Sequence, residues 1–479
     1  GRVARDAGRS GIDTLRLEGH ARFLASDLLE GRAPGTRGER LAAAYLATGL
    51  FGLGLEPLPG RDDYRLPVPL TAIDVDEVAA QVRIMSPTGT KTLRSPAFYH
   101  PGGSRDAFRN FEGELLFAGA EAEAVAVLDG EEVEGSIVVL TPPWEDAGEL
   151  EQALVAAGAA GALYLVPSEA FYERLRIVRG PMRYALPDVV DDPANQTSLP
   201  SLVGGPGLIR ALGLEIPSGS VGEWRAPGAL DRSMDVRLPH ETERRTGYNV
   251  AAGIVGADPD LRHEWIVYVA HYDHVGYAEP TAGDSLWNGF VDNAIGSAIL
   301  LEIARILAAD PPARSVAFLW TTAEEQGLLG ANWFVYESTI PPERIRAAIN
   351  IDGGAPPAPP IEWGLVGADA SDAGRAARQI VEGHGWTVNG VGMGPQSDHW
   401  PFHRAGIPAL LLFPGSELEG HSEKEARALA ERWIRAHTPE DEWHPDFPLA
   451  GVARYAKLAL EIGRSLAGVQ HTYGEKRSP

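Results

Sequence analysis

Side chains that could bind metal ions gather in the second half of the chain. Directly after three apolar runs stand His271-Tyr272-Asp273-His274, Glu324-Glu325 and Asp352. In open α/β sheets the carboxyl ends of parallel strands lie at one edge, and ligands bind there. We therefore expect these side chains to converge on one crevice, where Asp292 and His437 from other loops could complete the set.

The chemistry that these residue types allow is hydrolysis at a pair of metal ions. The chain contains no cysteine, so a zinc site would have to use imidazole and carboxylate ligands. Two ions about 3.5–4 Å apart need a carboxylate that bridges them, and a further acid must stay free to move protons. Each motif alone has an ordinary structural explanation, such as a surface turn or a helix cap. Their occurrence together, in this order, favours a metal centre.

The elements that would position these residues are strands and helices in alternation. Apolar runs predict strands at 265–270, 316–320, 347–350 and 409–413. A helix is predicted over 293–309, because Ile295, Ile299, Ile306 and Leu307 fall on one face of it. This alternation from residue 248 onward is typical of a largely parallel sheet covered by helices.

The first half of the chain divides into two differently patterned regions. Helical spacing covers 15–29, and a second helix is predicted to start at a capping box formed by Thr36 and Glu39 and to stop near Gly52. From 95 to 238 short β-rich runs at 113–117, 136–140 and 162–166 alternate with loops, and a small-residue helix is expected over 153–161. We therefore expect an inserted module at 95–238 that separates an N-terminal part, 1–94, from the part that carries the candidate ligands, 239–479.

Composition excludes several classes of function. The 479 residues include 66 acidic and 42 basic side chains, a formal net charge of −24. This charge disfavours nucleic acids and anionic membrane surfaces as partners. No apolar run approaches the roughly 18–20 residues of a membrane span. A serine hydrolase is also disfavoured, because the sequence has no Gly-x-Ser-x-Gly nucleophile elbow.

Taken together, the motifs resemble those of family M28 metallopeptidases, the di-zinc aminopeptidase-like group. The resemblance rests on His271-Tyr272-Asp273, Asn288-Gly289-Phe290-Val291-Asp292-Asn293-Ala294, Ala323-Glu324-Glu325-Gln326-Gly327-Leu328-Leu329-Gly330, Asn350-Ile351-Asp352, Ser397-Asp398-His399 and His437-Thr438-Pro439-Glu440-Asp441. It implies an α/β fold with a mixed, mostly parallel sheet flanked by helices. The runs 135–139 and 157–161 resemble a protease-associated (PA) domain inserted before that sheet.

The resemblance implies a role for each candidate residue. Asp292 would bridge two zinc ions per chain. His271 and Asp352 would complete one zinc site, and Glu325 and His437 would complete the other.

Two further acids would have catalytic roles. Glu324 would be the general base, and Asp273 would orient and polarise His271. The implied reaction is the release of N-terminal residues from peptides by a metallo-aminopeptidase. A carboxypeptidase, a glutaminyl cyclase and a receptor-like protein without catalysis remain open, and an exported location, periplasmic or extracellular, is expected.

The sequence departs from the family pattern at His274, where many members carry serine. We expect His274 to form a hydrogen bond behind the ligands rather than to bind metal. Other residues near the motifs are expected to be structural, namely His399, His403, Trp287, Trp400 and Trp443.

Overall fold

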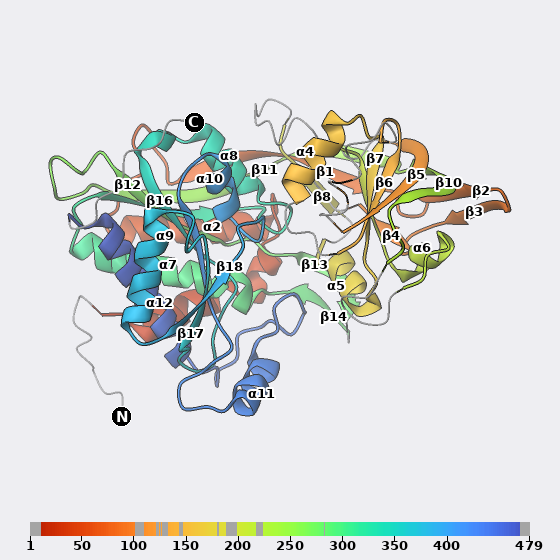
Figure 1. Ribbon diagram of the computed structural model, residues 1–479. Helices are drawn as coiled ribbons and strands as arrows, with labels where there is room; N and C mark the ends of the chain where they lie inside the picture. The colour runs from red at the N-terminus through yellow and green to blue at the C-terminus, as the bar shows by residue number, and fades with distance from the viewer. Residues whose placement is uncertain are drawn as a thin grey trace. The chain divides into compact units, whose positions relative to one another are not determined.

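The computed structural model describes residues 11–100, 110–120, 124, 126, 133–142, 147–179, 182–187, 199–216, 224–281 and 283–469. The chain forms two compact units (Figure 1). Unit 1 combines Gly1–Val68 with Thr246–Pro479, and unit 2 is Pro69–Arg245. The expected module 95–238 lies inside unit 2, and its identity as a PA domain stays a prediction.

The core of unit 1 is a mixed sheet. In sheet order its strands are β18 (Thr387–Val391), β17 (Glu362–Val366), β19 (Ala409–Pro414), β16 (Ile345–Ile351), β12 (Trp265–His271), β15 (Ser315–Thr321), β11 (His240–Ile254) and β1 (Arg65–Val75). A ninth strand, β8 (Met182–Ala185), belongs to unit 2 and pairs with residues 71–74 of β1. The pairs β12–β15, β12–β16 and β16–β19 are parallel.

The central strands form where the sequence predicts them. Every residue of β12 and of β15 is buried, which is why both read as continuous apolar runs rather than as alternating ones. Pairing of β12 with both β15 and β16 places the carboxyl ends of three strands at one edge. All four strands predicted for this region are confirmed, each extended by one to three residues.

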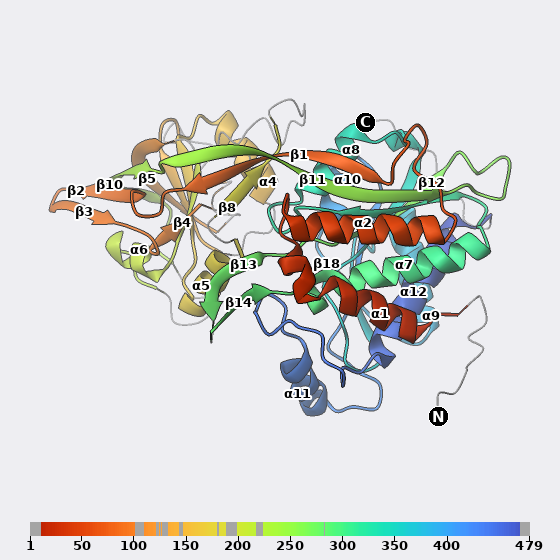
Figure 2. The same cartoon turned by 180° about the vertical axis from the view of Figure 1, so that it is seen from behind.

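Helices cover both faces of this sheet. They are α1 (Thr14–Leu24), α2 (Arg37–Gly52), α7 (Ile295–Ala309), α8 (Leu329–Glu337), α9 (Asp372–Gly383), α10 (His399–Arg404), α11 (Glu423–Trp433) and α12 (Ala450–Ala467), with short helical turns η1 (Asp27–Arg32), η3 (Phe290–Ala294) and η4 (Pro342–Arg344). One face packs against α1, α2, α7, α9 and α12 in one hydrophobic cluster, and the other packs against α8 and α10. Figure 2 shows α1, α2 and α7 side by side. No helix in the described part of the chain is long and apolar enough to cross a membrane.

Three predictions for these helices need correction. The helical spacing predicted over 15–29 continues only to Leu24, where α1 ends, and the turn η1 follows it. The predicted helix 293–309 begins only at Ile295, because 290–294 form the separate turn η3. The capping box at α2 is half formed. Thr36 Oγ1 accepts a hydrogen bond from Glu39 N at 3.3 Å, but the Glu39 carboxylate turns inward to other partners instead of returning to the cap. Tertiary contacts have therefore replaced half of a local motif.

Unit 2 is built on a second mixed sheet. Its strands, in sheet order, are β3 (Gly89–Leu93), β2 (Gln81–Ser86), β10 (Gly228–Arg237), β5 (Phe111–Gly119), β6 (Ile137–Leu140), β7 (Gly161–Leu165), β9 (Ser201–Gly204) and β4 (Phe98–Tyr99). The helices α4 (Ala147–Ala156), α5 (Glu169–Arg179) and α6 (Pro206–Ala211) belong to it. The helix expected over 153–161 is wrong in extent: α4 ends at Ala156, and Gly158 follows at φ +77° in a turn.

The packing of α12 on β12 can be tested with two helical glycines. A Cβ at Gly463 would lie 1.7 Å from Tyr268 Oη, whose hydroxyl donates to Ala459 O. We expect Gly463→Ala to destabilise the protein by about 1–3 kcal/mol. Gly19→Ala is the matched control, because a Cβ there meets nothing within 4 Å. It should stabilise α1 by up to about 1 kcal/mol. Calorimetric melting of both variants checks this, and an unchanged melting temperature for Gly463→Ala would contradict the described packing.

Candidate metal centre

Three of the candidate site residues lie at the carboxyl edge of the central sheet. His271 is the last residue of β12 and pairs with Thr321, the last residue of β15. Asp352 follows β16 directly, and Glu324 lies in the turn after β15. Because the strands are parallel, these side chains meet: ligand atoms of His271, Glu324 and Asp352 all lie within 4.8 Å of one another.

Asp292 is presented by an irregular turn rather than by a strand. Gly289 begins this turn at φ +60°, and a Cβ there would lie 2.5 Å from the ring of His274. The Asp441 carboxylate accepts hydrogen bonds from Val291 N at 2.8 Å and from Asp292 N at 3.1 Å. Asp441 therefore fixes the backbone of Asp292. Sequence reasoning assigned no role to Asp441, although it ends the quoted motif 437–441.

The two oxygens of Asp292 face two different imidazoles. Asp292 Oδ1 lies 3.1 Å from His271 Nε2, and Asp292 Oδ2 lies 2.7 Å from His437 Nε2. His271 Nε2 is also 3.3 Å from Asp352 Oδ1. His437 Nε2 is 3.3 Å from Glu325 Oε2. The residues thus form two donor sets that share Asp292.

These spacings suit a pair of divalent ions. Ligand atoms at about 2.0–2.1 Å from a tetrahedral ion lie about 3.3 Å from one another, and three of the four distances between donor atoms are 3.1–3.3 Å. Imidazole nitrogens and carboxylate oxygens are also donors that zinc accepts. The residues therefore fit two metal ions bridged by one carboxylate.

Hydrogen bonds hold the outer oxygens of the donor sets. Ser397 Oγ donates to Asp352 Oδ2 at 2.6 Å, and Asn350 Nδ2 donates to Ser397 Oγ at 2.7 Å. His274 Nδ1 lies 2.7 Å from Glu325 Oε1, the oxygen that does not face His437. This is a hydrogen bond behind a candidate ligand. A ring nitrogen of His274 also lies within 4.8 Å of ligand atoms of Asp292 and Glu325. That His274 does not itself bind metal therefore stays a prediction.

Negative charge dominates the electrostatics of the centre. Burial lowers the pKa of His271, but the charges of Asp352 and Glu324 outweigh it and raise that pKa well above its usual value. Burial also lowers the pKa of His437, but the negative charges of Glu325 and Asp292 outweigh this effect and raise that pKa to about 12. The acids thus draw protons onto both imidazoles. Bound cations would satisfy the same negative field.

Glu324 and Asp273 lie beside the donor sets. Burial, followed by the negative charges of Asp352 and Glu325, raises the pKa of Glu324 well above its ordinary value. Asp273 Oδ1 accepts a hydrogen bond from Glu324 N at 3.1 Å. His271 Nδ1 lies 3.3 Å from the backbone oxygen of Asp273 and 3.8 Å from its carboxylate. The backbone carbonyl is therefore the nearer partner of the imidazole.

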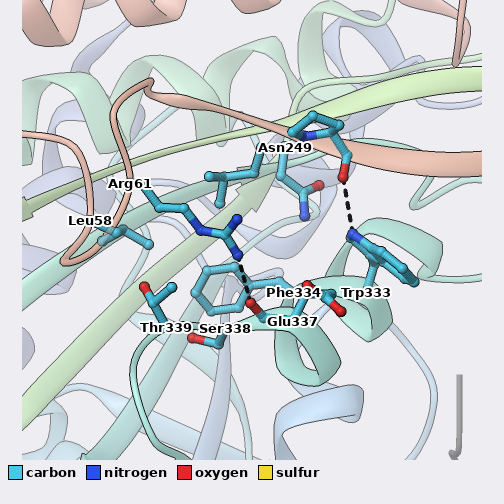
Figure 3. Close-up of a pocket in the computed structure, with 10 residues that line it drawn as sticks. Leu58, Arg61, Asn249, Trp333, Phe334, Glu337, Ser338 and Thr339 are labelled. Carbon is cyan, nitrogen blue, oxygen red and sulfur yellow. Dashed lines mark hydrogen bonds between the residues drawn. The ribbon is translucent and has the colours of Figure 1, made fainter.

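The turn after β15 is also fixed from behind. Asn249 Oδ1 accepts from Thr322 N at 3.1 Å, and its Nδ2 donates to Gly330 O at 2.8 Å. Asn249 lines a cavity of about 220 Å³ together with Trp333 and Arg61 (Figure 3). The side-chain amide of Asn249 therefore holds the backbone at both ends of this turn.

Among the described residues, the histidines and tryptophans that flank the motifs fall outside the groups that could hold a metal ion. His399 is buried in α10, and the ring of His403 lies 5.4 Å from that of Trp400. Trp287 is buried, and Trp443 packs under the guanidinium of Arg22 at 4.3 Å. A separate, largely apolar cavity of about 450 Å³ is lined by the two residues that follow Asp352 in the chain, Gly353 and Gly354, and by Pro414, Ala430 and Ile434 among others.

Comparison with known proteins identifies the ligand-bearing part of the chain. Residues 249–462 match the model of peptidase family M28. This segment, which is less than half of the chain, is therefore similar to the peptidases of that family. The matched segment contains every candidate ligand, whereas α1 and α2 precede it.

The chain is also similar, over part of its length, to curated proteins. The chain is 29% identical over 187 residues to "Aminopeptidase YwaD" of Bacillus subtilis (strain 168), which is 38% of this chain and 37% of that protein. It is 31% identical over 193 residues to "Leupeptin-inactivating enzyme 1" of Streptomyces exfoliatus, 39% of each chain. The alignments thus span less than two thirds of either relative.

Solved structures share the fold over nearly the whole chain. An aminopeptidase from Aneurinibacillus sp. strain AM-1 superposes with a TM-score of 0.57 at 17% identity, covering 98% of this chain and 97% of that one. A peptidase M28 precursor from Shewanella amazonensis SB2B gives 0.50 at 18% identity, with coverage of 97% and 98%. The predicted α/β fold, with a mixed sheet flanked by helices, is therefore confirmed.

The support that Asp441 gives to Asp292 generates a prediction about metal binding. Asp441→Asn would place an amide N–H₂ against one of two backbone N–H donors, so one hydrogen bond would be lost. We expect metal affinity, measured by competition with a chromogenic chelator, to fall about 10–100-fold. Glu442→Gln is the matched control, because that neighbour is exposed. Equal affinities for the two variants would show that Asp441 does not position Asp292.

Proposed function

We propose that this protein is a di-zinc aminopeptidase that removes residues from the N-terminus of peptides. The observation that carries the proposal is the pair of donor sets that share Asp292, with a fourth acid, Glu324, beside them. Hydrolysis of a peptide bond at two metal ions requires this combination of a bridging carboxylate and a free carboxylate.

The ligand assignment follows the two donor sets. One zinc ion would be held by His271, Asp352 and Asp292, and the other by Glu325, His437 and Asp292. When bound, such a pair polarises a carbonyl oxygen and lowers the pKa of a shared water. The side chain of His437 is 37% exposed, whereas that of His271 is 1% exposed. Substrate would therefore approach from the side of His437.

Glu324 would move the proton. Burial and the neighbouring acids raise the pKa of Glu324 above that of an ordinary carboxyl group, which is the direction that favours accepting a proton. The bond from Glu324 N to Asp273 fixes the base relative to the loop of His271. Asp273 would thus position both groups, by its carboxylate and by its backbone oxygen.

Several observations support an aminopeptidase over the alternatives. The relatives just described include a protein named an aminopeptidase. The largely apolar cavity that Gly353 and Gly354 help to line has room for an apolar side chain. The acids of the centre attract the positively charged amine of a peptide and repel a terminal carboxylate. The intact donor sets disfavour a receptor that has lost catalysis.

Two further parts of the proposal rest on the sequence. Unit 2 would be a PA-like domain, which its parallel strands β5, β6, β7 and β9 support. An exported location, periplasmic or extracellular, stays a prediction that fractionation of the source cells would test.

Glu324→Gln tests the assignment of the base. The amide keeps the size of the side chain but cannot accept the proton, so hydrolysis of an aminoacyl p-nitroanilide should fall by at least about 10²–10⁴-fold. The zinc content, measured by mass spectrometry of the metal, should stay at two ions per chain. Glu343→Gln in η4 is the exposed control. Retained turnover in Glu324→Gln would refute the role of Glu324.

A peptide mixture tests the direction of cleavage. We expect peptides with a free amine to shorten one residue at a time from the N-terminus, and N-acetylated copies to resist, as followed by mass spectrometry. Chelation should stop the reaction and zinc should restore it. Loss of C-terminal residues would indicate a carboxypeptidase instead, and pyroglutamate formation would indicate a cyclase. No conversion together with no bound metal would favour the receptor-like alternative.

A further inference from the structure

Two buried charged residues of the N-terminal segment play no part in the proposed reaction. Arg32, in the loop between α1 and α2, and Glu39, in the first turn of α2, are both fully buried. An isolated charge is costly to bury, so such residues need many hydrogen bonds to persist. Most hydrogen bonds of Arg32 and Glu39 go to loops that carry the candidate ligands.

Arg32 binds the loops that carry His271 and Asp292. Its Nε donates to Tyr272 O at 2.5 Å, directly after His271. Nη1 donates to Asn288 O at 2.6 Å and to Leu24 O, and Nη2 donates to Gly289 O at 3.0 Å. The planar fork of one guanidinium therefore ties the end of β12 to the turn that presents Asp292.

Glu39 binds the loops that carry His271 and Glu324-Glu325. Its Oε1 accepts from Thr322 Oγ1 at 2.6 Å, in the turn before the two glutamates, and lies 3.3 Å from the Tyr272 hydroxyl. The same oxygen accepts from Tyr248 N at 2.8 Å, and Oε2 accepts from Gly35 N at 2.7 Å. This explains why Glu39 leaves the capping box.

The backbone of this segment is shaped for these contacts. Arg32 itself has φ +55°, and Gly31 has φ +66°. A Cβ at Gly31 would lie 2.4 Å from Trp287 O, so the chain passes against the residue that precedes Asn288. The segment thus lies directly against one of the ligand-bearing loops.

We propose that Arg32 and Glu39 are positioning residues that set the spacing of the two donor sets by joining three ligand-bearing loops from outside the matched domain. Tyr272 is the shared point: Arg32 binds its carbonyl, and its hydroxyl lies beside Glu39. This inference rests on the proposed metal centre. It assigns the N-terminal segment a role in metal affinity that folding alone would not require.

The test compares Arg32→Lys with a matched buried arginine. Arg314 is also buried, donates to Glu264 Oε2 at 2.6 Å and to Gly468 O at 2.6 Å, and lies at the opposite, N-terminal end of β15. Arg314→Lys therefore controls for loss of a buried guanidinium. Zinc affinity is measured by chelator competition, and the visible spectrum of the Co²⁺-substituted protein reports ligand geometry. Melting temperature, kcat and KM complete the set.

We expect Arg32→Lys to weaken zinc binding about 10–100-fold, to alter the Co²⁺ spectrum and to lower kcat with little change in KM. Lysine keeps the charge, but its three donors lie on one nitrogen and cannot reach all four carbonyls that Arg32 binds. Arg314→Lys should lower the melting temperature while leaving zinc affinity and the spectrum unchanged. Equal zinc affinity and identical spectra for both variants would overturn the proposal.

Thr322→Val serves as the second variant if Arg32→Lys does not fold. It removes one hydroxyl donor from Glu39 and leaves the carboxylate in place. The expected result is again weaker zinc binding with a changed spectrum, and wild-type values would overturn the role of Glu39. A wild-type protein that binds no divalent ion would refute the metal centre itself and, with it, this inference. Normal wild-type binding with unaffected variants would refute only the positioning role.

Discussion

The concentration of carboxylates at the carboxyl edge of the central sheet is the constraint on which the other features depend. Five acids gather there, namely Asp273, Asp292, Glu324, Glu325 and Asp352. Two like charges 4 Å apart repel by about 4 kcal/mol at an effective dielectric constant of about 20. Several such pairs would rival the net stability of a typical protein, about 5–15 kcal/mol. The protein must therefore both supply positive charge and hold the acids rigidly.

Rigidity comes from the buried sheet and from the hydrogen bonds around it. Strands β12 and β15 are buried along their whole length, and twelve residues of α7 are buried against them and their neighbours. Close-packed interiors of this kind do not deform gradually. Asp441, Ser397 and Asn249 then fix individual ligand loops to that frame. Acids that cannot move apart can be neutralised only by protons or by cations.

The sequence predicted the central strands and the candidate ligands better than the hydrogen bonds that hold the ligand loops in place. Strand ends and candidate ligands could be predicted because buried parallel strands leave a continuous apolar run and the polar residues follow each run at once. Contacts such as those of Asp441 with Val291, or Glu39 with Tyr248, join residues 150 and 209 positions apart. No local pattern encodes such pairs. Glu39 even satisfied a local capping pattern, and the stronger tertiary hydrogen bonds to the carboxylate overrode it.

The backbone shows where the fold accepts strain to meet this constraint. Among the described residues, the non-glycine positions with positive φ are Glu30, Arg32, Asp231, Ala323, Leu328 and His437. Five of these six belong to the N-terminal segment, to the turn after β15 or to the loop of His437. A left-handed residue costs roughly 1–2 kcal/mol and persists only where its surroundings determine it. Around Ala323 the surroundings do so, because Asp273 holds Glu324 N and Leu329 N donates to Ala323 O. Among the described residues, backbone strain of this kind is therefore concentrated at the ligand loops and at the N-terminal segment that binds them. This concentration indicates that the rest of unit 1 maintains the spacing of the donor atoms.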